Sequence, residues 1–166
     1  MASIKGIELK NVKTFRGHEW EELQQANVYY KGKKVGFYSQ DSWGGSDIFR
    51  LDSNISNELR EEIENITNNY VGNVIFKKID DLYMKTYNLT FTYDHIGYEY
   101  LFEDLLKLVE DEKNYKKYTK MWKTDTITIL YRDLFNISIV SGRLKKEDEE
   151  KYTYFTYESL NDFIID

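Results

Sequence analysis

A short cluster in the N-terminal quarter of the chain holds residue types that bind metal ions. Residues 18–22, His-Glu-Trp-Glu-Glu, combine one imidazole with three carboxylates, and both groups are ligands of divalent cations. A histidine-rich site is excluded, because the chain contains two histidines and the other one is His95. A Mg²⁺ site built mainly from carboxylates stays open, since Mg²⁺ needs few protein ligands. The spacing favours no metal, so we predict that the chain has no metal ligands.

Other residues have the types used in catalysis, but the sequence lacks the motifs that accompany them in known catalytic sites. The pair Asp94-His95 could act in general acid–base chemistry. However, the sequence contains no Gly-x-Ser-x-Gly nucleophile turn and no glycine-rich phosphate-binding loop. The triplets at residues 8–10 and 149–151 match the Glu-x-Lys pattern of metal-dependent nucleases, but 29 acidic and 23 basic residues produce such triplets by chance. We therefore predict no catalytic residue and no cofactor.

Residues 41–47, Asp-Ser-Trp-Gly-Gly-Ser-Asp, form the segment where we expect contact with a partner. Gly44 and Gly45 permit a tight chain reversal, and Asp41 and Asp47 can accept hydrogen bonds from the backbone N–H groups of a turn. Trp43 has two alternatives. It folds back as a plug over the end of a sheet, or it projects as an anchor for a pocket of a partner protein. The sequence alone does not decide between them.

Five lysines near the end of an expected helix form a second candidate surface. Their spacing places most of them on one helix face. One interpretation is that they complement the negative end of the helix dipole. The other is a stripe that binds the phosphates of a nucleic acid or an acidic partner, although no arginine accompanies it. The residues are Lys113, Lys116, Lys117, Lys120 and Lys123.

The formal net charge of −6 is concentrated in one segment of the chain. Residues 53–112 carry five basic and thirteen acidic side chains, whereas the segments on either side are each close to neutral. Most such charge runs are solvated helix faces. An acidic surface can also compete with a phosphate backbone for the basic groove of another protein. We favour the first interpretation and keep the second as an alternative.

The elements that must position these residues indicate an α+β fold. Residues 1–52 have the pattern of an antiparallel β-meander, with an interrupted apolar strand at 4–12, a hairpin at 27–38 and a short strand at 48–51. Residues 41–47 then connect the last two strands. The apolar spacing predicts a helix over 53–70, capped by Ser53, and a longer helix over 98–122.

The second half of the chain adds further expected strands. Runs rich in β-branched and aromatic residues predict strands at 86–93, 126–131, 135–140 and 152–157. Residues 145–150 are expected to form a charged loop, and residues 158–165 a short closing helix. Antiparallel sheets with two principal helices make one domain over 1–166. An alternative division gives an N-terminal β-rich lobe, 1–52, and an α+β lobe, 53–166.

Length and composition limit the class of protein. The chain has 166 residues and no cysteine, so disulfides and thiol nucleophiles are excluded. Its first residues lack the apolar run of a signal peptide, and no stretch approaches the roughly 20 apolar residues of a membrane span. We therefore expect a cytoplasmic protein with no membrane contact.

The composition resembles that of small proteins encoded by phages and mobile elements of AT-rich bacteria. The chain is short and acidic, rich in lysine, and contains 15 tyrosines and no proline. Proteins of this kind include inhibitors of host defence such as anti-CRISPR proteins. The resemblance covers size and composition and no motif. It implies a chain that acts by occupying a surface of a host protein, for example one that binds nucleic acid.

These observations lead to one favoured function and two alternatives. We expect a non-enzymatic binding module whose partner-binding residues are Asp41, Trp43, Gly44, Gly45 and Asp47. The first alternative is a nucleic-acid-binding protein that uses the Lys113–Lys123 stripe, with Tyr115, Tyr118 and Trp122 as stacking platforms. The second is a hydrolase dependent on a metal ion held by carboxylates. The oligomeric state is open, because residues 86–93 and 152–157 could pair as edge strands between subunits.

Overall fold

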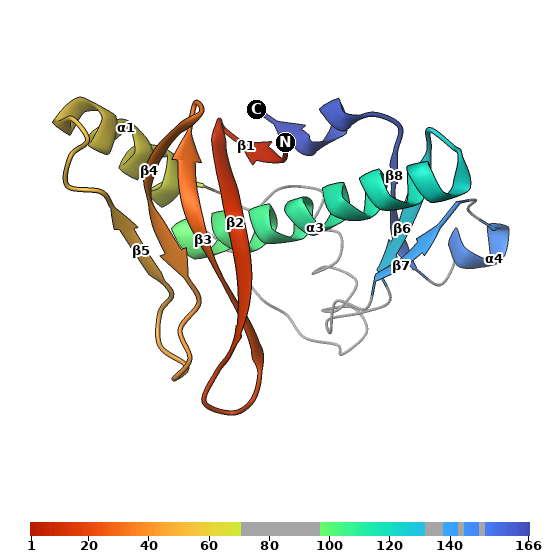
Figure 1. Cartoon of the computed structure of the whole chain (residues 1–166), viewed down its shortest axis with the longest axis horizontal. Helices are drawn as coiled ribbons and strands as arrows, with labels where there is room; N and C mark the ends of the chain where they lie inside the picture. The colour runs from red at the N-terminus through yellow and green to blue at the C-terminus, as the bar shows by residue number, and fades with distance from the viewer. Residues whose placement is uncertain (71–96, 132–137, 143–144, 150–151) are drawn as a thin grey trace.

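The computed structural model describes residues 1–70, 97–131, 138–142, 145–149 and 152–166 (Figure 1). Its elements confirm the expected α+β fold with N-terminal strands. A six-stranded sheet and a three-stranded sheet lie at opposite ends of one long helix, α3 (Tyr98–Trp122), which runs from one sheet to the other. The predicted strand at 86–93 and the pair Asp94-His95 lie outside the described residues. The single domain and its two-lobe alternative stay predictions.

The larger sheet is built mainly from the N-terminal meander. Its members are β1 (Ser3–Ile4), β2 (Ile7–Arg16), β3 (Glu22–Tyr30), β4 (Lys33–Ser39) and β5 (Ile48–Leu51). The order is β5-β4-β3-β2-β1-β9, and all neighbours are antiparallel except β1 and β9 (Ile164–Ile165). The expectation of one interrupted strand at 4–12 is wrong. Lys5 and Gly6 both have positive φ, so the chain reverses tightly there and Ile4 pairs with Ile7.

The strand pleat gives this sheet a buried inner face and an open outer face. Alternate side chains of β2 and β3, among them Ile7, Leu9 and Val28, are fully or nearly fully buried. They belong to the same core as Leu101 and Leu105 of α3. The meander therefore has one face packed on the helix, and its other face carries polar and charged side chains.

Gly36 occupies a position in β4 where the neighbouring strand leaves no room for a side chain. A Cβ atom there would lie 2.3 Å from the backbone oxygen of Arg50 in β5. We expect Gly36→Ala to separate β4 from β5 and to lower the free energy of unfolding by about 2–3 kcal/mol, as overpacking does. Urea denaturation measures this. Gly45→Ala is the matched control, because the atom nearest to its added Cβ would be an Asp41 carboxylate oxygen at 3.2 Å, an approach about 1 Å less close than at Gly36. A change below about 0.5 kcal/mol for Gly36→Ala would contradict the prediction.

The first helix begins later than the sequence suggested. Helix α1 (Asn57–Asn68) has Ser56 as its N-cap, and the Ser56 side chain accepts a hydrogen bond from the backbone N–H of Leu59. The expectation that Ser53 caps the helix is therefore wrong. Ser53 precedes Ile55, the first residue of the apolar spacing, but Ser56 is the one placed to receive an unpaired N–H of the first turn. The boundaries of α3 match the predicted helix over 98–122.

The smaller sheet confirms the predicted hairpin, whereas the expected charged loop and the expected closing helix both differ from the structure. It contains β6 (Ile127–Tyr131), β7 (Ser138–Ser141) and β8 (Thr153–Tyr157) in the order β7-β6-β8, all antiparallel. The expected charged loop includes a one-turn helix, α4 (Lys146–Glu149). The expected closing helix is a 3₁₀ turn, η1 (Leu160–Phe163), followed by β9. A capping box between Ser159 and Asp162 supports η1, and β9 forms because β1 offers it a free edge.

Helix α3 ends at Lys123 in a left-handed conformation. Lys123 has φ 53° and donates its backbone N–H to the oxygen of Thr119. Glycine adopts this conformation at little cost, so we expect Lys123→Gly to raise the free energy of unfolding by about 1 kcal/mol. Lys120→Gly, inside the same helix, should lower it by a similar amount. Thermal denaturation of both variants checks the pair, and destabilisation by Lys123→Gly would contradict the assignment.

Candidate functional site

The loop of residues 40–47 is held in one conformation by its two aspartates. The Asp41 carboxylate accepts hydrogen bonds from the backbone N–H groups of Trp43, at 2.8 Å, and Gly45, at 2.7 Å. The hydrogen bond from Gly45, followed by that from Trp43, makes the largest contribution to holding the pKa of Asp41 below its ordinary value. Gly44 has φ 75°, so the reversal needs a residue without a Cβ atom. The loop connects β4 and β5, as the sequence predicted.

Asp47 fastens this loop to the start of α3. Its side chain accepts hydrogen bonds from the backbone N–H of Asp41 and from the buried hydroxyl of Tyr38. Its backbone N–H donates to the Glu99 carboxylate at 2.9 Å, and its carbonyl oxygen accepts from the Tyr98 hydroxyl at 2.7 Å. The loop therefore has little freedom to move relative to the helix.

The sequence allowed either a buried or an exposed position for Trp43, and the structure shows the exposed one. Its side chain is 76% exposed, and its ring packs against His18 with the ring centroids 4.1 Å apart. His18 belongs to the loop between β2 and β3. The ends of β3 and β4 are joined by two hydrogen bonds between Gln24 and Gln40. Two loops that are distant in sequence are therefore neighbours at one end of the sheet.

Trp20 is a second exposed indole, on the same loop as His18. It is also 76% exposed, lies in the loop between β2 and β3, and has φ 66°. A positive φ is uncommon for a bulky residue, and the loop fixes it by a hydrogen bond from Gly17 to the oxygen of Glu21. The Arg16 guanidinium lies 5.6 Å from the indole centre. We call His18, Trp20 and Trp43 the aromatic tip.

The lysine stripe lies on the exposed side of α3, as the helical spacing predicted. Lys113, Lys117, Lys120 and Lys123 are exposed. Lys116 pairs with Glu112, and the Nζ–Oε1 distance is 2.6 Å. That contact compensates one of the five charges.

The expected stacking role of Tyr115 is wrong. Tyr115 is buried, and its hydroxyl donates to the backbone oxygens of Asp125 and Glu158. Tyr118 and Trp122 pack against each other, with centroids 4.7 Å apart. The stripe therefore offers fewer free aromatic faces than expected.

The candidate catalytic residues do not converge. Glu8 and Lys10 form an ion pair on β2, with an Nζ–Oε2 distance of 2.9 Å. Residues 150 and 151 of the other Glu-x-Lys triplet lie outside the described residues, as Asp94-His95 does. Among the residues with described positions, no group of three or more histidine or acidic side chains is placed to hold a metal ion. The cluster at residues 18–22 contributes His18 and Trp20 to the aromatic tip.

Sequence reasoning missed a set of buried acids. The interpretation of the acidic segment as solvated faces fails for Asp104 and Asp111, which are both buried. Asp104 accepts a hydrogen bond from the Tyr70 hydroxyl at 2.6 Å. Asp111 accepts from Tyr131 at 2.6 Å and Tyr157 at 2.7 Å. Both acids lie seven residues apart on the apolar stripe of α3, and that spacing is the signal which could have revealed them.

Burial raises the pKa of Asp111 to about 6, although the two tyrosine hydrogen bonds act in the opposite direction. Burial likewise raises the pKa of Tyr131 and Tyr157. Both hydroxyls therefore stay protonated and donate to Asp111 at neutral pH. This cluster joins α3 to β6 and β8, and each of its polar groups has a partner, so we assign it to the fold and not to a site.

Comparisons with known proteins identify no relatives of this chain. No protein-family model matches it. The search of curated proteins found no match, and neither did the search of solved structures. In the described segments, none of the helices has both the length and the apolar character required to cross a bilayer.

Proposed function

We propose that the chain is a non-enzymatic binding module that inserts the aromatic tip into a pocket of another protein. The observation that carries the proposal is that Trp20 and Trp43, each 76% exposed, lie on neighbouring loops. Tryptophan is among the residues that contribute most to binding energy when a partner buries them. The same side chains add nothing to the core of this chain.

The rigidity of the loop supports the same function. Binding orders flexible loops at a cost in entropy, and a loop already fixed in its bound form avoids most of that cost. Asp41 and Asp47 fix the Trp43 loop, and Tyr98 and Glu99 tie it to α3. The five predicted partner-binding residues thus divide into one contact residue, Trp43, and four that shape its loop.

The partner class that we propose comes from composition. The resemblance to phage-encoded inhibitors of host defence makes a bacterial host protein, for example a defence nuclease, the partner to test first. Occupation of its surface would block it without any chemistry by this chain.

Capture from a nuclease-treated bacterial lysate tests the proposal. Wild type, the double variant Trp20→Ala/Trp43→Ala, and Trp122→Ala are immobilised in equal amounts, and the retained proteins are quantified. Trp122 is the matched control, because it is 41% exposed on α3, outside the aromatic tip. We expect a protein retained by wild type and Trp122→Ala and lost with the double variant. Equal retention by all three would contradict the proposed function.

A further inference from the structure

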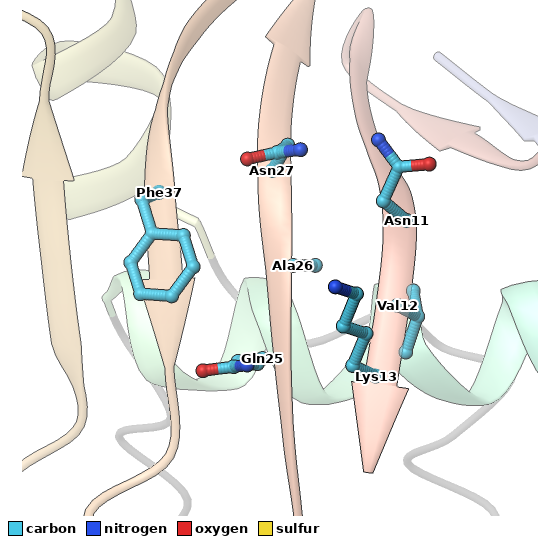
Figure 2. A pocket seen from close by; sticks show the side chains of 7 residues that line it. All are labelled: Asn11, Val12, Lys13, Gln25, Ala26, Asn27 and Phe37. Carbon is cyan, nitrogen blue, oxygen red and sulfur yellow. The ribbon is translucent and has the colours of Figure 1, made fainter.

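The outer face of the six-stranded sheet is a second surface with a chemistry of its own. Figure 2 shows the side chains of three strands there, with α3 behind the sheet. Register places Lys10, Asn27, Phe37 and Arg50 side by side in one row across β2, β3, β4 and β5. Residues that pair directly across antiparallel strands share a face, so this row belongs to the outer surface.

This face is basic although the chain as a whole carries a charge of −6. The adjacent rows add Lys13, opposite Gln25, and Lys34, opposite Tyr29. Among the paired residues described for these strands, the acid on this face is Glu8, which also pairs with Tyr29 and holds Lys10 in an ion pair. In the part of the chain that the structure describes, Lys13, Lys34 and Arg50 form no ion pair. Three uncompensated cations therefore favour a negatively charged occupant.

A hollow of about 380 Å³ lies beside Lys13, and Lys13 is the one cation of this face that lines it. The strand register slips between Lys10 and Lys13, so that a bulge interrupts β2 at this point. Phe37 borders the hollow and is 37% exposed. The lining also includes three amide side chains, which both donate and accept hydrogen bonds: Asn11, Gln25 and Asn27 (Figure 2).

We infer that this face binds single-stranded nucleic acid. Cations for phosphates, an exposed ring for stacking and amides for base edges are the groups by which proteins recognise unpaired nucleotides. An acidic peptide would use the cations but would leave the ring and the amides without a specific role. A duplex would keep its bases stacked on each other and away from Phe37. The inference does not depend on the aromatic tip, which lies at the end of the sheet.

Fluorescence anisotropy with labelled oligothymidylate and oligouridylate of about 12 nucleotides tests the inference, since an OB-fold-sized surface covers roughly 4–16 nucleotides. A duplex of equal length and polyglutamate are the competing ligands. The variants are Lys13→Glu/Arg50→Glu and Phe37→Ala. The controls are Lys113→Glu/Lys117→Glu on α3 and Trp20→Ala/Trp43→Ala at the tip. Thermal denaturation establishes that each variant is folded.

We expect wild type to bind one or both single strands more tightly than the duplex or polyglutamate. The charge variant should lose affinity at least tenfold. The slope of log K against the logarithm of the salt concentration should become less steep by about 1.4. Phe37→Ala should lose roughly tenfold with the salt slope unchanged, and both control variants should bind as wild type does. Absence of binding at low salt, equal binding of polyglutamate or duplex, or loss in the α3 variant would overturn the inference. Retention of binding by the tip variant would separate this result from the proposed function, and loss of binding in that variant would also overturn the inference.

Discussion

As pH rises from about 4 to about 6, the free energy of unfolding should lose roughly 3 kcal/mol through Asp111 alone. The pKa of this carboxyl is about 6 in the folded protein and near 3.8 in the unfolded chain. Between these values the folded state binds more protons than the unfolded state, so stability decreases as pH increases. Below pH 4 both states are protonated, and above pH 6 the full loss is established.

The variant Asp111→Asn isolates this contribution from other acids. Chemical denaturation of wild type and variant at pH 4, 5, 6 and 7 gives their difference in stability, in which all other titrating groups cancel. We expect that difference to shift by roughly 3 kcal/mol in favour of the variant across this range. Tyr157→Phe removes a hydrogen bond that lowers the pKa of Asp111, so its loss of stability should extend to higher pH and be larger in total than that of wild type. A difference that stays constant with pH would show that Asp111 is not protonated preferentially in the folded state.

The second large effect concerns the aromatic tip. With a partner obtained by capture, Trp20→Ala and Trp43→Ala are each expected to weaken binding by about 2 kcal/mol or more, roughly 30-fold in Kd. Titration calorimetry measures this, and thermal denaturation should show little change because neither indole is part of the core. Trp122→Ala should bind as wild type does. Loss of stability in step with affinity would show that the tip supports the fold.

The same titration tests whether the loop is fixed in advance. Asp41→Ala removes the acceptor of the Trp43 and Gly45 N–H groups while leaving Trp43 in place. We expect it to weaken binding by about 1 kcal/mol, since the loop must then be ordered on binding. Asp41→Asn keeps an oxygen at the accepting position and should restore most of the affinity. If Asp41→Asn weakens binding as much as Asp41→Ala does, the carboxylate charge of Asp41 contacts the partner directly.

The sequence predicted the elements whose signal is local. Helix α3 has an uninterrupted apolar stripe, and the hairpin of β3 and β4 surrounds a glycine-containing turn. The buried state of Asp111 could not be predicted in the same way, because its partners Tyr131 and Tyr157 lie 20 and 46 residues further along the chain. A charge pattern in the sequence does not distinguish a buried carboxylate from a solvated one, because it contains no information on such long-range partners.

The two candidate surfaces show the same limit. Residues 41–47 were recognisable, because glycines and aspartates around one tryptophan have a local meaning. The role of Trp20 could not be predicted in this way, because only the pairing of β2 with β3 and of β3 with β4 brings its loop next to the loop of Trp43. The basic outer face draws its residues from four strands, and it exists only through their register.

The parallel pairing of β1 with β9 joins two segments that the ribosome synthesises far apart in time. Residues 3–4 emerge early, yet their parallel partner, residues 164–165, emerges more than a hundred residues later. Until then β1 presents an unpaired edge, and the core lacks Phe163, which is fully buried in the finished protein. The nascent chain must therefore protect an incomplete sheet until residues 163–165 have been synthesised.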